Sequence, residues 1–229
     1  MKVVLPDSIG SVTLVDHNVS WRKVSAVAGI CTGAKDAEKA TRVYNLFAKG
    51  EMSPFEFCNL EFILEIPQRT AVHFLRHRTS KNQQRSGRYT DGVGRAYVPP
   101  SLPVAGSLTL PEGPRDKVCF LKPQGERTQL RQQIDLRNFM CGVLPQRLSK
   151  HAQYETRATA IAMAALFRSV DQVLYGLWLD HIFYRVQVDL RDLQLRGAVR
   201  FDLQRRVLAR KLEWRKNIAQ AIQDAEVVP

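Results

Sequence analysis

The sequence predicts an α+β fold in which a mostly antiparallel sheet is covered by helices and followed by a helical C-terminal region. Three observations support this prediction. Short apolar segments typical of strands occur in the first third of the chain, and helical spacing dominates the last third. The composition, with 45% hydrophobic and 24% charged residues among 229, is that of a folded protein with a substantial core.

The N-terminal elements follow from local patterns. Residues 12–16 are typical of a strand, and residues 21–31 of a helix that stops at Gly33. A second helix is expected over residues 37–49, because Gly50 suits the C-cap position.

Residues 58–66 (CNLEFILEI) alternate as a strand does, with Leu60, Phe62 and Leu64 on one face. Pro67 ends this strand and can sit in the first turn of the next helix, which carries His73.

The second half begins with a long irregular connection, residues 91–125, which is rich in Gly and Pro. Helices are expected over residues 127–141 and 150–168, and residues 175–225 are expected to be mostly helical with a break near Gly197. We therefore predict one domain over residues 1–171 and a helical basic extension over residues 172–229.

The chain is strongly basic, with a formal net charge of +12 and a pI near 9.9, which favours anionic ligands or polyanions. Much of the excess lies in the C-terminal extension, at Arg196, Arg200, Arg205, Arg206, Arg210, Lys211, Arg215 and Lys216. These residues alternate with apolar ones along a predicted helix, which is typical of a solvated helix packed by one face. Nucleic-acid binding through this region is possible but not favoured.

The four cysteines, Cys31, Cys58, Cys119 and Cys141, have no CxxC spacing, so the sequence predicts buried free thiols and no metal site. No apolar run approaches about 20 residues, and no charged-then-apolar leader is present. We therefore expect a cytoplasmic protein.

The segment RHRTSKNQQRSGRY, residues 76–89, is the strongest functional signal. It holds four arginines, one histidine and one lysine without any acidic residue, directly behind an apolar helical segment. Guanidinium groups bind phosphate in bidentate fashion, and Gly87 allows a close approach of backbone N–H groups. The segment predicts a nucleotide phosphate site, and a basic surface loop or a generic nucleic-acid patch is the alternative.

This segment resembles the motif RHRxxSxNxxSxR of the flavin-dependent thymidylate synthases. The matching residues are Arg76, His77, Arg78, Ser86 and Arg88, with Tyr89 after them. The first serine of the motif falls on Lys81 and its asparagine on Gln83. A Ser-x-Asn triplet does occur one residue early, at residues 80–82, so the segment can be re-registered rather than lost.

Two further blocks resemble the same family. Residues 51–57 (EMSPFEF) match its HxTPFEH-type segment, with Ser53 in the hydroxyl position and Glu51 in place of a histidine. Residues 147–157 (RLSKHAQYETR) match its RxxxxAQxEIR helix. The resemblance covers roughly residues 11–171.

The resemblance implies the fold of that family, a homotetramer, and the cofactors FAD, NADPH and methylenetetrahydrofolate. It also implies C5 methylation of a pyrimidine nucleoside monophosphate, dUMP to dTMP or a close variant. The implied cofactor-binding residues are Ser53, Arg76, His77, Arg78 and His151. The implied substrate-binding residues are His73, Gln84, Ser86, Gly87, Arg88 and Arg147, with Arg147 also catalytic and no metal ligand among them.

Three of these assignments have a physical basis or an alternative. A fixed cation at Arg147 beside the O2 edge would stabilise negative charge in the ring, although Arg147 could instead form a surface ion pair with Glu155. His73 could donate to a phosphate or simply pack on its helix. Ser86 is not expected to act as a nucleophile, because no local base other than His77 lies near it in sequence.

Departures from the family motif leave the substrate open. Gln84 stands where the family has glutamate, and it replaces an acceptor-only group by an amide that also donates. Cytosine nucleotides, ribonucleotides and a hydroxymethyl product remain alternatives. So do a non-catalytic nucleotide- or flavin-binding protein and a nucleic-acid-binding protein.

Overall fold

The computed structural model describes residues 1–6, 9–33, 39–76, 79–86, 127–142, 154–180, 209, 213, 216–217 and 219–229. The expected irregular connection over residues 91–125 and the expected break near Gly197 lie outside these residues.

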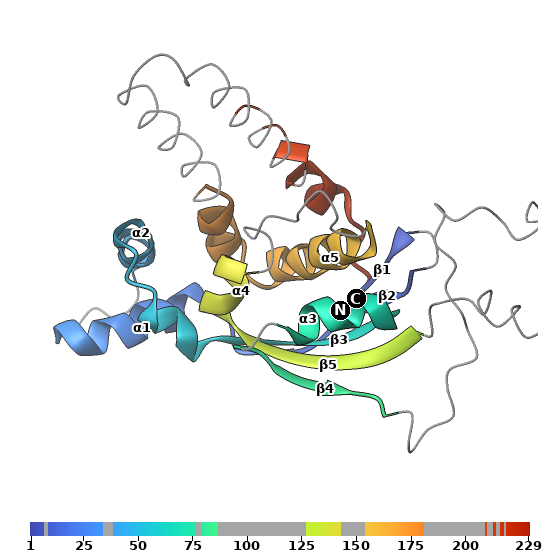
Figure 1. Ribbon diagram of the computed structural model, residues 1–229. Coiled ribbons are helices and arrows are strands. Elements are labelled where there is room, and N and C mark those ends of the chain that lie inside the picture. The colour runs from blue at the N-terminus through green and yellow to red at the C-terminus, as the bar shows by residue number, and fades with distance from the viewer. Residues whose placement is uncertain are drawn as a thin grey trace, which may run out of the picture.

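The centre of the fold is one five-stranded sheet in the order β1-β2-β3-β5-β4, and every neighbouring pair is antiparallel (Figure 1). Its strands are β1 (Lys2–Val4), β2 (Ser11–His17), β3 (Asn59–Pro67), β4 (Lys81–Gln84) and β5 (Arg127–Asp135). The expected strands over residues 12–16 and 58–66 are therefore β2 and β3. The prediction of a mostly antiparallel sheet is confirmed.

The described helices are α1 (Trp21–Thr32), α2 (Ala40–Lys49), the 3₁₀ helix η2 (Ser53–Phe57), α3 (Gln68–Leu75), α4 (Leu136–Gly142) and α5 (Tyr154–Val170). A further helix over residues 172–180 follows α5. Helices α3 and α5 lie on the same side of the sheet, and α1 and α2 lie beyond one end of it (Figure 1). This arrangement confirms the α+β fold class.

The core lies between the sheet and these helices. The alternation predicted for β3 is present, because Leu60, Phe62 and Leu64 are fully buried. Aromatic rings with centroids 5.3–6.2 Å apart join β3 to the helices, at Phe62, Phe139, Phe167, Tyr175 and Trp178. Burying each such ring contributes about 1.5–3 kcal/mol, so this cluster is a large part of the stability.

Two glycines end α1 and α2 as the sequence predicts. Gly33 has φ 61° and Gly50 has φ 77°, and the backbone N–H of each caps carbonyl groups of its own helix. The left-handed conformation is strained for residues with a Cβ atom, which explains why both helices stop where they do.

The prediction of a helix over residues 127–141 is wrong in its first nine residues. Residues 127–135 form β5, and only residues 136–142 are helical. Arg and Gln favour helices in isolation, but pairing on both sides with β3 and β4 decides the conformation here. The period of two is visible in the buried residues Thr128, Leu130, Gln132 and Ile134.

The end of the chain returns to the N-terminal edge of the sheet. Lys2 and Val228 exchange backbone hydrogen bonds of 2.7 and 2.8 Å, and Ile222 is fully buried. The Arg168 guanidinium on α5 donates to the Gln223 carbonyl at 3.0 Å. The last residues thus pack on the same core as the sheet, and the domain boundary at residue 171 stays a prediction.

The basic C-terminal run lies almost wholly outside the described residues, where only Lys216 is described, and it is exposed. No described helix is long and apolar enough to cross a membrane.

Cys58 is buried as expected, but Cys31 and Cys141 are exposed free thiols, so the expectation of burial is wrong for these two. Cys119 lies outside the described residues.

Candidate functional site

The arginine-rich segment begins where α3 ends. Pro67 ends β3, as predicted, and is the N-cap of α3 rather than part of its first turn, while Thr70, Ala71 and Phe74 bury one face of the helix. The helix stops at Arg76, whose side chain is exposed. The packing of a short helix therefore presents one guanidinium group of the motif to solvent.

His73 lies on the exposed side of the same helix. His73 takes no part in the core, because Ala71 and Phe74 fill the buried face of the helix. An exposed imidazole three residues before Arg76 is available to a ligand.

The next described element after Arg76 is the strand β4, which the sequence did not predict. Lys81 and Gln83 are exposed, whereas Asn82 and Gln84 are partly buried. Successive side chains of a strand point to opposite faces. Lys81 and Gln83, which stand where the family motif has serine and asparagine, therefore face away from Asn82.

The early Ser-x-Asn triplet faces the buried side chains of β5. The Ser80 hydroxyl accepts hydrogen bonds from Asn82 Nδ2 at 2.9 Å and from Gln132 Nε2 at 3.1 Å. Asn82 lies opposite Gln132 in the strand register. The interpretation that the motif is re-registered by one residue agrees with this geometry.

The C-terminal end of β4 holds two further predicted residues. Gln84 Nε2 donates to the Thr128 hydroxyl at 3.2 Å, and the Arg85 backbone N–H donates to the Gln129 carbonyl at 2.9 Å. Ser86 follows as an exposed residue. Pairing with β5 thus fixes the chain as far as Arg85, directly before Ser86, the first of the predicted phosphate-binding residues.

Ser53 is exposed at the first position of η2, while Pro54 and Phe55 anchor this short helix in the core. Glu56 of η2 forms an ion pair with Arg137 of α4. The Glu56 carboxylate raises the pKa of Arg137 above its ordinary value, first through the hydrogen bond and then through its charge. This pair connects the segment that carries Ser53 to the end of β5.

Helices α3 and α5 are joined by an ion pair between Arg69 and Glu155. The Glu155 side chain is 4% exposed, and its second oxygen is buried without a hydrogen-bond partner in the described structure. Arg69 already forms an ion pair with the first carboxylate oxygen of Glu155. An ion pair between Glu155 and Arg147 is therefore not needed to explain why this carboxylate is buried.

The structure describes five of the eleven predicted site residues: Ser53, His73, Arg76, Gln84 and Ser86. The other six, His77, Arg78, Gly87, Arg88, Arg147 and His151, lie outside the described residues, and their roles stay predictions.

Sequence reasoning missed Gln132, Arg69 and Arg137, all of which contact the segments that carry predicted residues. Gln132 could have been found from the alternation of residues 128–134, which a strand explains better than a helix.

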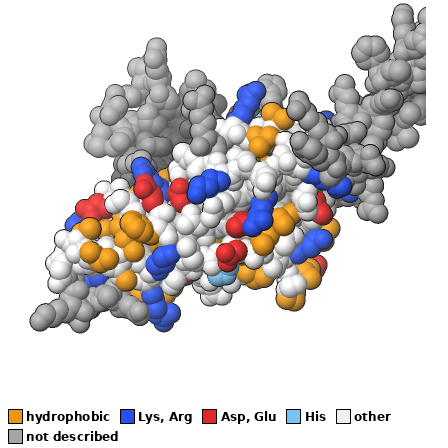
Figure 2. Space-filling view, turned by 90° about the horizontal axis from the view of Figure 1, so that it is seen from below, with side chains coloured by type: hydrophobic (Ala, Val, Ile, Leu, Met, Phe, Trp, Pro, Cys, Tyr) orange, Lys and Arg blue, Asp and Glu red, His pale blue; other side chains and the backbone are white. Residues whose placement is uncertain are grey.

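The open face of the sheet differs from the helix-covered face. Figure 2 shows basic and acidic side chains interspersed on this side of the molecule, with hydrophobic side chains in several patches between them. A hollow of about 450 Å³ on the open face is lined by Glu61, Lys81, Asn82, Gln83, Arg131 and Gln133. Arg131 and Glu61 form an ion pair there.

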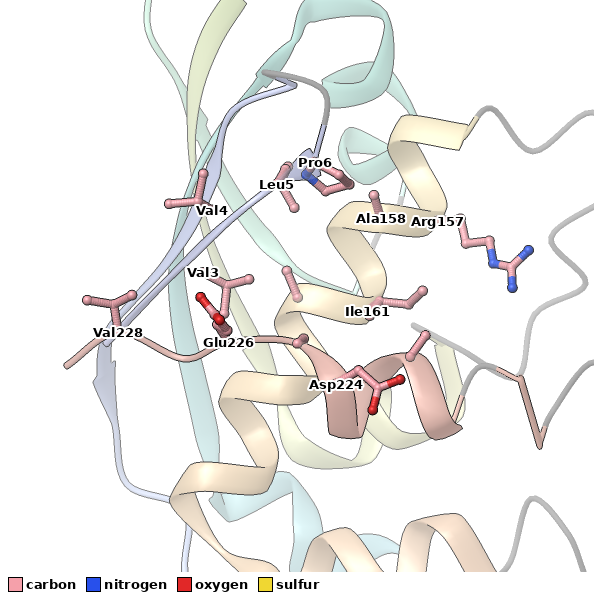
Figure 3. A pocket seen from close by; sticks show the side chains of 13 residues that line it. Val3, Val4, Leu5, Pro6, Arg157, Ala158, Ile161, Asp224, Glu226 and Val228 are labelled. Atoms are coloured by element: carbon pink, nitrogen blue, oxygen red, sulfur yellow. The ribbon is translucent and has the colours of Figure 1, made fainter. Parts of the chain in front are cut away.

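A larger hollow of about 620 Å³ lies between β1, α5 and the C-terminal segment (Figure 3). Its wall is mostly apolar, with Val3 and Leu5 from the N-terminal segment, Ile161 from α5, and carboxylates at Asp224 and Glu226. None of the five predicted site residues that the structure describes lines it.

These features define an α+β protein in which Arg76 is exposed at the end of a short helix that precedes an edge strand in the chain. Residues 13–112 match the family model described as Thymidylate synthase complementing protein (Thy1).

The chain is also similar to curated relatives. It is 28% identical over 212 residues to the flavin-dependent thymidylate synthase of Thermotoga neapolitana, covering 80% of this chain and 96% of the relative. It is 24% identical over 200 residues to the enzyme of the same name from Kosmotoga olearia, covering 72% of this chain and 85% of the relative. These matches confirm the resemblance to the flavin-dependent thymidylate synthases, at 24–28% identity.

A solved structure shares the fold. The UMP/dUMP methylase PolB from Streptomyces cacaoi, bound with 5-Br dUMP, superposes with a TM-score of 0.57 at 21% identity. The match covers 73% of this chain and 93% of PolB. This likeness supports the fold assignment.

Proposed function

We propose that the protein is a flavin-dependent enzyme that methylates C5 of a pyrimidine nucleoside monophosphate, with dUMP to dTMP as the first candidate reaction. Methylenetetrahydrofolate would supply the carbon and NADPH the reducing equivalents. The active form would be a cytoplasmic homotetramer with FAD bound to each site.

The observation that carries this proposal is the place of the arginine motif in the fold. Arg76 is exposed at the end of α3, and Ser80 and Asn82 are held against β5 directly after it. A similarity to flavin-dependent thymidylate synthases that spans 80% of the chain adds independent support.

The described donors fit an anionic dinucleotide and a nucleotide phosphate. Arg76 supplies a guanidinium group, Ser53 and Ser86 supply exposed hydroxyl groups, and residues 76–89 include no carboxylate. A cation and neutral donors without competing acids are what a phosphate ester requires.

In this proposal each group of residues has one task. Arg76, His77 and Arg78, with Ser53 and His151, hold the flavin. When bound, the flavin carries reducing equivalents from NADPH to the transferred carbon.

The nucleotide is held separately. Ser86, Gly87 and Arg88 hold its phosphate, with His73 and Gln84 beside them. Arg147 lies against the pyrimidine and stabilises the negative charge that develops as C5 becomes nucleophilic.

A second candidate is the same chemistry on UMP, dCMP or CMP, or with a hydroxymethyl product. Gln84 supports this second candidate. Its amide donates a hydrogen bond to the Thr128 hydroxyl, and an ionised glutamate, the family residue at this position, has no proton to donate. The side chain is therefore oriented by β5 in a way that is specific to this chain. PolB, which shares the fold, is named for action on both UMP and dUMP.

The experiment has two stages. The visible spectrum of the purified protein, reconstituted with FAD and freed of excess, tests flavin binding. The flavoprotein is then incubated with NADPH, methylenetetrahydrofolate and dUMP, UMP, dCMP or CMP, and the nucleotides are analysed by mass spectrometry.

Each outcome has a distinct meaning. A mass gain of one methyl or hydroxymethyl group identifies the substrate and the product. Flavin binding without any product would favour a non-catalytic flavin protein. No flavin, together with salt-sensitive binding to DNA or RNA, would favour the nucleic-acid alternative.

A further inference from the structure

Polar side chains occupy positions between β4 and β5 that an ordinary core would fill with apolar ones. Gln132 is 1% exposed, and it lies opposite the fully buried Phe62 on β3 and opposite Asn82 on β4. A buried amide destabilises a fold by about 1–3 kcal/mol for each group left without a partner. Its presence there needs an explanation other than packing.

The explanation lies in what Gln132 holds. Its Nε2 donates to Ser80 Oγ at 3.1 Å, and the same oxygen accepts from Asn82 Nδ2 at 2.9 Å. Asn82 Nδ2 also lies 3.4 Å from the Ser80 carbonyl oxygen, which fixes the orientation of this amide. Ser80, which directly precedes β4, is therefore bound by one residue of β4 and by one residue of β5.

This contact selects one register of β4. A slip by one residue would exchange the two faces of the strand and place Lys81 and Gln83 against the core. Lys81 and Gln83 now line the hollow on the open face with Glu61 and Arg131. Burying a lysine ammonium group beside Gln132 would cost more than any hydrogen bond in this cluster returns.

We propose that Gln132 is a positioning residue for Arg76, which the proposed function assigns to flavin binding. By holding Ser80, which directly precedes β4 and lies four residues after Arg76, Gln132 fixes the point at which the chain from Arg76 enters the sheet. This inference rests on the proposed function, and it adds a residue outside the three blocks that carry the family resemblance.

Two buried acceptors of the same cluster extend the inference. Gln132 Oε1 and Asn82 Oδ1 have no hydrogen-bond partner in the described structure. Both oxygens can therefore each accept a further hydrogen bond at the contact between β4 and β5.

The test compares Gln132→Met with Gln133→Met. Methionine keeps the length of glutamine but cannot donate to Ser80, and position 133 lies on the opposite, partly exposed face of the same strand. We expect Gln132→Met to weaken FAD binding by about tenfold or more, because a small displacement of a binding group is costly. Gln133→Met should bind FAD as the unchanged protein does.

A double-mutant cycle separates positioning from general stability. Ser80→Ala removes the shared oxygen, so Gln132→Met should cause no further loss of FAD affinity in the Ser80→Ala background. A purely structural role for Gln132 would give additive losses and a lower melting temperature without this coupling.

Three outcomes decide the matter. Coupled losses of FAD affinity support the inference. Wild-type FAD affinity in Gln132→Met or in Ser80→Ala overturns it while leaving the proposed function intact. Failure of the unchanged protein to bind FAD overturns both the inference and the proposed function. If Gln132→Met does not fold, Ser80→Ala still tests the inference, because Ser80 is partly exposed and its replacement disturbs the core less.

Discussion

Arg69 of α3 and Glu155 of α5 form an ion pair between the two helices that flank the candidate site. The first helix ends at Arg76, where the arginine-rich segment of residues 76–89 begins, and the second follows residues 147 and 151 by a few positions in the chain. The carboxylate is almost fully buried, whereas the guanidinium is one-third exposed. This pair therefore ties together the two segments in which the sequence places its candidate arginines.

Replacing Arg69 with methionine should destabilise the protein strongly. The change leaves the Glu155 carboxylate buried without its cation, and such a loss typically costs about 3 kcal/mol of unfolding free energy. Urea denaturation followed by circular dichroism measures it. Arg69→Met combined with Glu155→Gln should recover part of the loss, and an equal loss in both variants would contradict the explanation by an unpaired charge.

Lys81 and Gln83 stand where the family motif has serine and asparagine. Replacing them with those two residues should not improve flavin binding. Lys81→Ser with Gln83→Asn changes only side chains that are exposed on the other face of β4. We expect FAD affinity within about twofold of the unchanged protein, since surface changes away from a site are usually neutral.

Asn82→Ala is the matched comparison in the same strand. It removes a hydrogen bond to Ser80 and should weaken FAD binding. Flavin fluorescence titration measures both proteins. A large gain of affinity in the double variant would show that β4 adopts the other register when the flavin binds.

The C-terminal residues should contribute measurably to stability. Ile222 is fully buried, and truncating such a residue to alanine costs about 2–5 kcal/mol. Val228→Ala serves as the control, because Val228 is 50% exposed and loses little contact. Thermal melts of both variants test this, and equal melting temperatures would mean that the return of the chain to β1 is energetically unimportant.

The cysteines should differ in reactivity. Burial raises the pKa of the Cys58 thiol above its ordinary value, so the folded protein keeps this thiol neutral and shielded. Under native conditions, a thiol reagent at neutral pH should modify the exposed Cys31 before Cys58. Peptide mass spectrometry after timed labelling measures the order of modification.

The same shift predicts a loss of stability at high pH. The unfolded chain loses the Cys58 proton from about pH 8.5 upward, whereas the folded chain retains it to a higher pH. The unfolded state then binds fewer protons, so the unfolding free energy falls as the pH rises through this window. Cys58→Ala should show a shallower fall between about pH 8 and 10 than the unchanged protein.

The sequence by itself predicted the features that depend on neighbours along the chain. The two glycine caps, the alternation of β3 and the helix after Pro67 depend on local backbone preferences and on spacing. The arginine motif depends on residue type and order, and the similarity to flavin-dependent thymidylate synthases confirmed what it implied about the family.

Only the tertiary structure decided the edge of the sheet at the candidate site. Residues 127–135 are polar enough to be helical alone, and they become β5 because β3 and β4 satisfy their backbone on both sides. The same pairing turns Ser80 and Asn82 inward and Lys81 outward. A strand's register is set by the free energy of the partners that it meets across the sheet, and residues 46 to 76 positions away in the chain supply those partners for β5.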